Sequence, residues 1–259
     1  NRAAKLAAQK KEDRARRLRR RALQLTSVAV VLAAVLGISA LMAGSDDPSE
    51  TTTSLPAGLP DTYVAFRELP TACDAQAPDP VELMSFDAPD DQGLDPADTV
   101  TATVVTSCGE ITLDLDPAAA PETVNSFVFL ARQGYFDGSV FHRVRAGFVL
   151  QGGDPTASGS GGPGYFIPDE YPEEGFEYGA GVLAMANRGE GTTGSQFFIV
   201  LGDSDLPSTY SVFGRAVDSD ETLEAIEAVS VTFSEGLVEE SSPLEAIYIE
   251  EVRIQVTEG

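Results

Sequence analysis

The stretch FHRVRAGFVLQGGDP, residues 141–155, decides how this chain folds. Two apolar runs, residues 139–145 and 147–153, are separated by one small residue and end at a glycine pair, which is typical of neighbouring short strands. Among the apolar residues lie His142, the only histidine of the chain, and Arg143. We therefore expect two strands here, and a structural or chemical reason for the polar pair.

Residues 99–116 predict a β-hairpin. In its second half Ile111, Leu113 and Leu115 alternate with polar residues, so that they face one side of a strand. The residues SCG lie between this run and the alternating run before it, where they are expected to form the turn.

The remaining segments complete a mainly β pattern. Apolar residues recur at helical spacing in residues 121–134 and 219–229. Glycine-rich loops separate further short strand candidates, which are residues 181–187, 195–201, 211–217 and 245–256. Many short strands with two helices and no βαβ alternation predict a closed antiparallel β-barrel.

Charge divides the chain into two unlike parts. Ten of the 17 basic residues lie in residues 1–21, which leaves seven basic against 39 acidic residues in residues 22–259. No lysine follows Lys11, so the body of the protein lacks the basic surface that nucleic acid requires. We expect no nucleic-acid partner, and we interpret the acidic excess as a solvated surface.

The basic leader, residues 1–21, is followed by an uncharged apolar segment, residues 22–43. A helix of that length reaches roughly 33 Å, enough to span the hydrocarbon core of a bilayer. The arginines before it and the acids after it place the N-terminus in the cytoplasm. The sequence thus predicts a single-pass protein of the cell membrane with an extracytoplasmic body, and a cleaved signal peptide is the alternative.

The body divides by composition into three parts. Residues 44–62 are polar and rich in Thr, Ser, Pro and Gly, which predicts a disordered linker. Residues 63–98 combine apolar groups with repeated prolines and acids, and we interpret them as an irregular arm. The arm is expected to lean on the regular domain, residues 99–257.

The two cysteines lie in different parts of this body. Cys73 belongs to the arm and Cys108 to the turn of the first hairpin. Outside the cytoplasm such a pair favours one disulfide, which would stabilise the protein by roughly 3–4 kcal/mol. Two free thiols are the alternative, and one histidine with two distant cysteines does not make a zinc site.

Several reaction types are excluded. A Ser-His-Asp hydrolase would need His142, but no serine lies in the sharp G-x-S-x-G turn. The glycine-rich residues 159–164 lack the following Lys-Ser/Thr of a phosphate cradle and are interpreted as a loop. What remains is chemistry without a nucleophile, base or cofactor.

Isomerisation of an X-Pro peptide bond is such a reaction. Its barrier of about 20 kcal/mol comes from amide resonance and falls when the prolyl nitrogen becomes pyramidal. A fixed guanidinium that donates a hydrogen bond to this nitrogen favours the twisted amide, and an apolar pocket holds the proline ring.

Three blocks resemble the cyclophilins, a family of peptidyl-prolyl isomerases: FDGSVFHRVRAGFVLQGGDP, GVLAMANRGEGTTGSQFFIVL and YSVFGRAV, which are residues 136–155, 181–201 and 210–217. The resemblance spans about residues 99–257. It implies an eight-stranded closed barrel capped by two helices, without cofactor or metal. The leader, anchor and arm look like those of membrane-anchored bacterial members, so the expected substrates are proline-containing segments of exported proteins.

The resemblance also assigns roles to single residues. Arg143 would be the catalytic arginine, oriented by Gln151 and flanked by Phe148. Proline-pocket residues would be Phe148, Val149, Phe198 and Leu206. The peptide groove would contain Ala186, Asn187 and Arg188, with Gln196 bounding the neighbouring pocket and Tyr210 standing where many relatives have histidine. The alternatives are places in the core for the apolar residues and a surface ion pair for Arg143.

Period-two geometry supports part of this assignment independently. Gln196 and Phe198 share one face of a strand, and Phe197 points to the other face, towards the core. The same spacing places Arg143 and Phe141 together on the face opposite His142. We therefore expect His142 to be a hydrogen-bonded structural residue rather than a proton donor.

Two departures from the family pattern affect ligands. The chain has no tryptophan, and Asp205 stands nearest to the position where many members carry one, which predicts weak binding of cyclosporin. Arg188 is larger than the alanine often found at its position, and an acidic residue before proline is expected to be favoured. The alternative function is a binding or chaperone module for proline-containing segments with little turnover.

Overall fold

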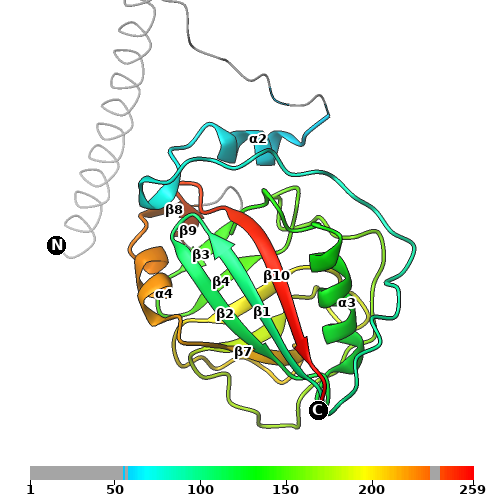
Figure 1. Cartoon of the computed structure of the whole chain (residues 1–259). Coiled ribbons are helices and arrows are strands. Elements are labelled where there is room, and N and C mark those ends of the chain that lie inside the picture. The colour runs from blue at the N-terminus through cyan, green and yellow to red at the C-terminus, as the bar shows by residue number, and fades with distance from the viewer. Residues whose placement is uncertain (1–54, 56–57, 234–239) are drawn as a thin grey trace, which may run out of the picture. The chain divides into compact units, whose positions relative to one another are not determined.

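The computed structural model describes residue 55 and residues 58–233 and 240–259 (Figure 1). Residues 55–259 form one compact unit, which contains both the arm and the regular domain. The leader, the predicted membrane segment (residues 22–43) and most of the predicted linker lie outside the described residues.

The single-pass membrane location is corrected. Within the described ranges, no helix combines the length and the apolar composition that crossing a bilayer requires. The longest described helix has 12 residues, fewer than the roughly 20 that a span needs.

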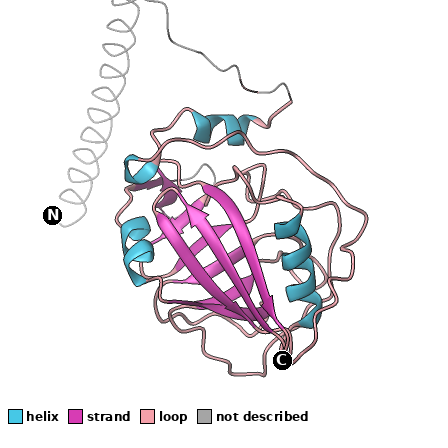
Figure 2. Cartoon of the chain, viewed as in Figure 1, coloured by secondary structure: helices cyan, strands magenta, loops and turns pink. Residues whose placement is uncertain are grey.

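The domain is built on one antiparallel sheet of eight strands (Figure 2). Its spatial order is β10-β1-β2-β7-β5-β6-β4-β3. The strands are β1 (Thr99–Thr106), β2 (Gly109–Leu115), β3 (Arg143–Arg145), β4 (Val149–Gly152), β5 (Val182–Met185), β6 (Phe197–Val200), β7 (Val212–Val217) and β10 (Ile249–Thr257). Each strand falls inside a predicted segment or extends one by a residue, so the mainly β prediction is confirmed.

The prediction of a closed barrel is wrong. The sheet is curled but open, since β3 and β10 form its two edges and do not pair with each other. Strand β3 has only three residues. The segments before β3 and β10 meet in a single isolated bridge between Val140 and Tyr248, supported by a 2.9 Å hydrogen bond from Phe141 N to Ile247 O. An edge strand this short offers too few backbone groups to continue the ladder.

The two predicted helices are present and flank the curled sheet on different sides, as α3 (Pro121–Arg132) and α4 (Asp220–Glu227) (Figure 1). In α3 the residues that face the sheet are Val124, Phe127, Val128 and Ala131, all buried at helical spacing. Proline at the first helical position suits the start of α3, where its missing N–H leaves no intrahelical bond unmade.

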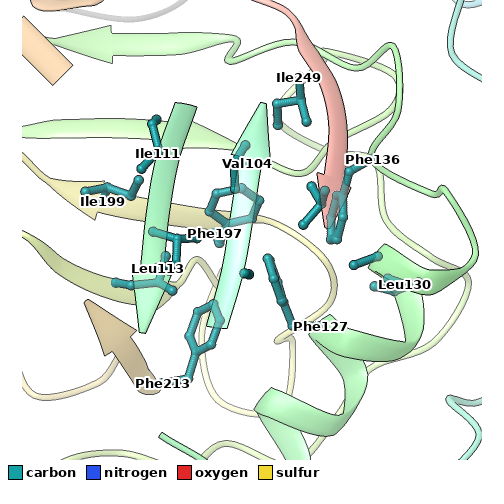
Figure 3. Packing of buried hydrophobic residues seen from close by; sticks show 14 of the residues in the cluster. Val104, Ile111, Leu113, Phe127, Leu130, Phe136, Phe197, Ile199, Phe213 and Ile249 are labelled. Atoms are coloured by element: carbon teal, nitrogen blue, oxygen red, sulfur yellow. The ribbon is translucent and has the colours of Figure 1, made fainter. Parts of the chain in front are cut away.

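The aromatic side chains of the core meet between α3 and the sheet. Phe127 of α3 lies 5.5 Å from Phe197 of β6 and 5.4 Å from Phe213 of β7, measured between ring centroids. Phe136 adds an edge-to-face contact of 5.8 Å with Phe197. Figure 3 shows these rings together with the aliphatic residues of β1 and β2. Phe197 takes part in three ring contacts, with Phe127, Phe136 and Phe141.

The arm is more regular than predicted. It contains α2 (Asp61–Arg67) and a 3-10 turn, η1 (Ala72–Asp74), and the start of α2 falls within the predicted linker. Tyr63 and Phe66, one turn apart on α2, are both buried. The Tyr63 hydroxyl donates to Gly138 O at 2.7 Å and accepts from Val81 N at 2.9 Å. Tertiary packing therefore stabilises a helix too short to be recognised from its own residues.

After α2 the arm runs past α3 before it enters β1 (Figure 1). Gln92 N donates to the Asn125 side chain of α3 at 2.7 Å. Cys73 and Cys108 form the expected disulfide, with Cα atoms 5.2 Å apart, and this bond ties the arm to the first hairpin.

A second hairpin was not predicted. Strands β8 (Val231–Phe233) and β9 (Glu240–Pro243) form a separate two-stranded sheet, and β9 contacts β3. Its strands are short and do not alternate clearly, so their sequence carries little strand signal.

The central aromatic contact predicts a large cost for truncation. We expect Phe197→Ala to lower the free energy of unfolding by about 3–5 kcal/mol, because it leaves a cavity among rings that cannot collapse together. Urea unfolding followed by circular dichroism measures this. As a control, Phe233→Ala removes a ring that is 59% exposed and should change the value by less than about 0.5 kcal/mol. Equal losses in both variants would contradict this account of the core.

The disulfide predicts a second stability effect. Because it closes a loop with a sequence separation of 35, its reduction should lower the free energy of unfolding by about 4 kcal/mol. Unfolding curves with and without dithiothreitol measure the difference. The double variant Cys73→Ser/Cys108→Ser should match the reduced protein and show no response to the reductant. A response that persists in this variant would mean that the reductant acts elsewhere.

Candidate active site

Three neighbouring strands bring the candidate residues together. In the β3–β4 pair Arg143 lies opposite Gln151, and in the β4–β6 pair Gln151 lies opposite Phe198. Residues directly opposite each other in an antiparallel pair have side chains on the same face. The register therefore aligns Arg143, Gln151 and Phe198 in one row across the sheet.

This row borders a pocket of about 220 Å³. All its lining residues were assigned to the site from the sequence; they are Arg143, Phe148, Val149, Gln151, Ala186, Asn187, Phe198, Leu206 and Tyr210. Most of them are apolar, and the polar groups of Arg143, Gln151 and Asn187 lie among them. We call this cavity the proline pocket, after the role that the family resemblance predicts for it.

The guanidinium of Arg143 is held at the pocket by two described contacts. Its Nη1 atom donates a 3.2 Å hydrogen bond to Oε1 of Gln151. Its Cζ atom lies 5.6 Å from the centre of the Phe148 ring, within the range of a cation–π contact. These contacts orient a permanently charged group beside an apolar cavity.

The apolar side of the pocket is a cluster of rings. Phe198 and Tyr210 meet edge to face at 5.5 Å, and Tyr178 contacts Tyr210 at 6.3 Å. The Tyr178 hydroxyl donates to the backbone oxygen of Tyr210 at 2.9 Å. This bond anchors the loop that carries Tyr210 and Leu206 against the sheet.

The strand faces match the alternation in the sequence only in part. Phe197 and Ile199 belong to the main core, while Phe198 belongs to the pocket cluster, as predicted. On β3, however, the core-facing neighbour of Arg143 is Val144. Phe141 lies before β3 and is buried in the core too, so period-two spacing does not extend back to it.

A second pocket of about 380 Å³ adjoins the first, since both are lined by Gln151, Ala186 and Asn187. We call it the neighbouring pocket. Gln196 and Arg188 line this pocket and not the proline pocket. Residues 159–166 form its other wall, and they include the glycine-rich residues 159–164 that the sequence analysis interpreted as a loop. No signal in the sequence indicated the partner segment that makes this loop a wall.

Hydrogen bonds connect the two pockets. Gln151 Nε2 donates to Oε1 of Gln196 at 3.1 Å, and Gln196 Nε2 donates to the backbone oxygen of Gly161 at 2.9 Å. Gln151 thus uses its oxygen for Arg143 and its nitrogen for Gln196. The amide orientation of each glutamine follows from these partners.

The glycine pair that ends the opening stretch has a steric reason. Gly153 has φ of +81°, and a Cβ atom at this position would lie 2.3 Å from the backbone oxygen of Ser195. A side chain is therefore excluded where β4 passes close to the segment before β6.

One expectation about His142, that it is hydrogen-bonded, is corrected by the structure. Its side chain is half-buried overall, yet both ring nitrogens are buried and have no hydrogen-bond partner in the described part of the chain. The hydrogen bond expected for this residue is therefore not made within the described part of the chain. Burial lowers the pKa of His142 to about 4, although the nearby Asp154 carboxylate acts in the opposite direction.

Asp154 is a buried carboxylate that organises the wall of the neighbouring pocket. It accepts hydrogen bonds from Thr156 N at 2.8 Å, Ser160 N at 3.0 Å and Gly161 N at 2.9 Å. Burial alone would raise its pKa, but the hydrogen bonds outweigh burial and lower it. These hydrogen bonds compensate the buried negative charge of Asp154, and residues 154–161 fold around its carboxylate.

The domain thus combines a curled half-barrel sheet with an arginine beside an apolar pocket and a second pocket next to it. The model of the family described as cyclophilin type peptidyl-prolyl cis-trans isomerase/CLD matches residues 101–254. The chain belongs to this family and is a peptidyl-prolyl cis-trans isomerase.

Individual relatives agree with this membership. The chain is 42% identical over 177 residues to peptidyl-prolyl cis-trans isomerase A of Mycobacterium tuberculosis strain H37Rv, covering 61% of this chain and 94% of that protein. It is 41% identical to the probable isomerase A of Mycobacterium leprae, covering 60% and 91%. A cyclophilin type isomerase of Cryptosporidium parvum has a similar structure, with a TM-score of 0.53, 32% identity and coverage of 61% and 98%. That protein has also been solved in the presence of the dipeptide Ala-Pro.

The buried imidazole predicts a pH dependence of stability. The unfolded chain binds a proton at His142 near pH 6.5, whereas the folded chain binds it only near pH 4. Stability therefore falls as the pH drops from 6.5 to 4, by up to about 3 kcal/mol from this group. We expect His142→Leu to flatten this part of the profile of unfolding free energy against pH. If the variant keeps the wild-type slope, other groups cause the loss.

Proposed function

We propose that the enzyme isomerises X-Pro bonds by holding the proline ring in the proline pocket while Arg143 acts on the prolyl nitrogen. The observation that carries this proposal is the guanidinium fixed by Gln151 and Phe148 at the edge of an apolar cavity of about 220 Å³. The Ala-Pro dipeptide used with the Cryptosporidium relative is a ligand of the size that such a cavity accommodates.

The reaction breaks and forms no covalent bond, so the site must favour one conformation of the amide. In the planar amide the nitrogen lone pair is delocalised and is a poor hydrogen-bond acceptor, whereas in the twisted amide it is localised. A hydrogen bond from Arg143 is therefore stronger in the transition state than in either ground state, which is the condition for catalysis.

The other residues have supporting roles in this proposal. Phe148, Phe198 and Leu206 exclude water from the ring and strengthen the interaction of Arg143 with the nitrogen. Gln151 keeps the guanidinium in place. Asn187, whose side chain donates to Thr209 O at 2.7 Å, is a groove residue whose backbone remains for the peptide.

Two finer expectations belong to the same proposal. Disulfides persist in oxidising compartments, so the Cys73–Cys108 bond favours an enzyme that works in such a compartment. Its expected substrates are therefore proteins that fold there, such as exported proteins. Weak binding of cyclosporin stays a prediction: the exposed Asp205 precedes Leu206 at the pocket and supplies no indole ring.

The test is a proline-isomerisation assay on the full chain. We expect Arg143→Ala to lower kcat/KM by roughly a hundredfold, because it removes a hydrogen bond that forms fully only in the transition state. Arg143→Lys keeps the charge but loses the planar fork, and should recover only a small part of the rate. Circular dichroism and thermal unfolding check that both variants are folded.

Rates that are equal for wild type and Arg143→Ala, and close to the uncatalysed rate, would contradict the proposed mechanism. In that case titration with a proline-containing peptide distinguishes an inactive preparation from a binding module. A Kd that stays unchanged while no rate enhancement is found would favour the module.

A further inference from the structure

The neighbouring pocket has an unusual charge for this chain. The sequence has 41 acidic residues, yet no carboxylate is among the described residues that line this pocket. One charged residue does line it, and that residue is Arg188. The acidic surface is thus interrupted at the point where a substrate would lie beside the proline pocket.

Arg188 reaches across the mouth of the pocket. Its Nη2 atom donates to the backbone oxygen of Gly159 on the opposite wall at 3.2 Å, while its own backbone N donates to Thr192 Oγ1 at 2.8 Å. No carboxylate lies within 4.0 Å of its guanidinium in the described part of the chain. Since a guanidinium has five N–H donors, most remain for a ligand.

The carboxylate of Asp169, which binds the loop just after Arg188, is already engaged in hydrogen bonds. Asp169 accepts from Gly191 N at 2.6 Å and from Thr193 Oγ1 at 2.5 Å, and these hydrogen bonds lower its pKa although burial opposes them. Asp169 therefore holds the loop that carries Arg188 rather than neutralising the arginine.

The wall opposite Arg188 is preformed. Gly161 is held by Asp154 and by Gln196, at 2.9 Å each. The arm adds a further support, since Phe86 N donates to the backbone oxygen of Pro163 at 2.8 Å and the Phe86 ring packs on Phe129 at 5.0 Å. A rigid wall reduces the ordering cost when a substrate side chain enters.

The position of the substrate side chain follows from the geometry of an extended peptide. Successive side chains point to opposite faces, and residues two apart lie about 6.5 Å apart on the same face. The two pockets lie side by side and share Gln151, Ala186 and Asn187. With proline in one pocket, the side chain two residues away is the one directed towards the other.

We propose that Arg188 makes the neighbouring pocket selective for an acidic side chain two residues away from the proline. Arg188 is then a specificity-determining residue of this enzyme, whose cation pairs with the substrate carboxylate while its bond to Gly159 keeps it at the mouth. The inference rests on the proposed function, because it needs proline in the proline pocket.

The experiment measures kcat/KM on matched peptides that carry Glu, Gln or Lys two residues before or two residues after a single proline. We expect the wild type to prefer Glu over Gln by about two- to fivefold in one of the two series, the range of an exposed ion pair. The preference should shrink in 1 M salt because the charges are screened. Arg188→Ala should abolish the preference, measured as the ratio of its own rates on the Glu and Gln peptides, and Arg188→Glu should favour Lys.

A matched control separates this local effect from the net charge of the protein. Arg253→Ala removes one positive charge from β10, where Arg253 is paired with Glu110 and Glu251, and should keep the Glu preference. Equal rates on the Glu and Gln peptides in both series for wild type, or a preference that survives in Arg188→Ala, would overturn the proposal. In either case turnover of the Gln peptide that depends on Arg143 would leave the proposed function intact.

Discussion

Strand β6 carries the constraint on which the rest of the domain depends. Phe197 and Phe198 are adjacent, so their rings must lie on opposite faces of the sheet. Phe197 enters the aromatic core and contacts rings from α3 and from the segments before β3, whereas Phe198 forms the apolar side of the proline pocket. Packing of the core therefore sets the position of the pocket. A shift of β6 by one residue would exchange these two surfaces.

The polar part of the site is built on the same register. Arg143, Gln151 and Gln196 come from three segments, and each forms its described hydrogen bond to the next because β3, β4 and β6 are neighbours. The chain of bonds continues to Gly161 on the far wall. The two pockets therefore share one scaffold, and the roles proposed for Arg143 and Arg188 depend on the same hydrogen-bonded row.

Sequence reasoning succeeded where the determinants are local. Alternation in residues 110–116 and helical spacing in residues 121–134 report directly which face is buried. The three blocks that resemble the cyclophilins led to the set of residues that line the cavity beside Arg143. Sequence reasoning failed where the determinant was a distant partner. The helix at Asp61–Arg67 depends on contacts to Gly138 and Val81, and the open edge of the sheet depends on how far β3 can pair. The residues next to His142 in the sequence also do not indicate that both of its ring nitrogens are buried.

By itself, the sequence determined the main strand and helix types, because short-range periodicity is a property of the chain. The candidate site residues around Arg143 came from the resemblance to the cyclophilins, and a disulfide between the two cysteines was favoured but left open. The tertiary structure alone decided that the barrel stays open, that residues 159–166 become a wall of the site and that Arg188 lies at its mouth without a carboxylate within 4.0 Å among the described residues. These features arise from contacts between segments far apart in sequence, whose distances and charges exist only once the core has packed.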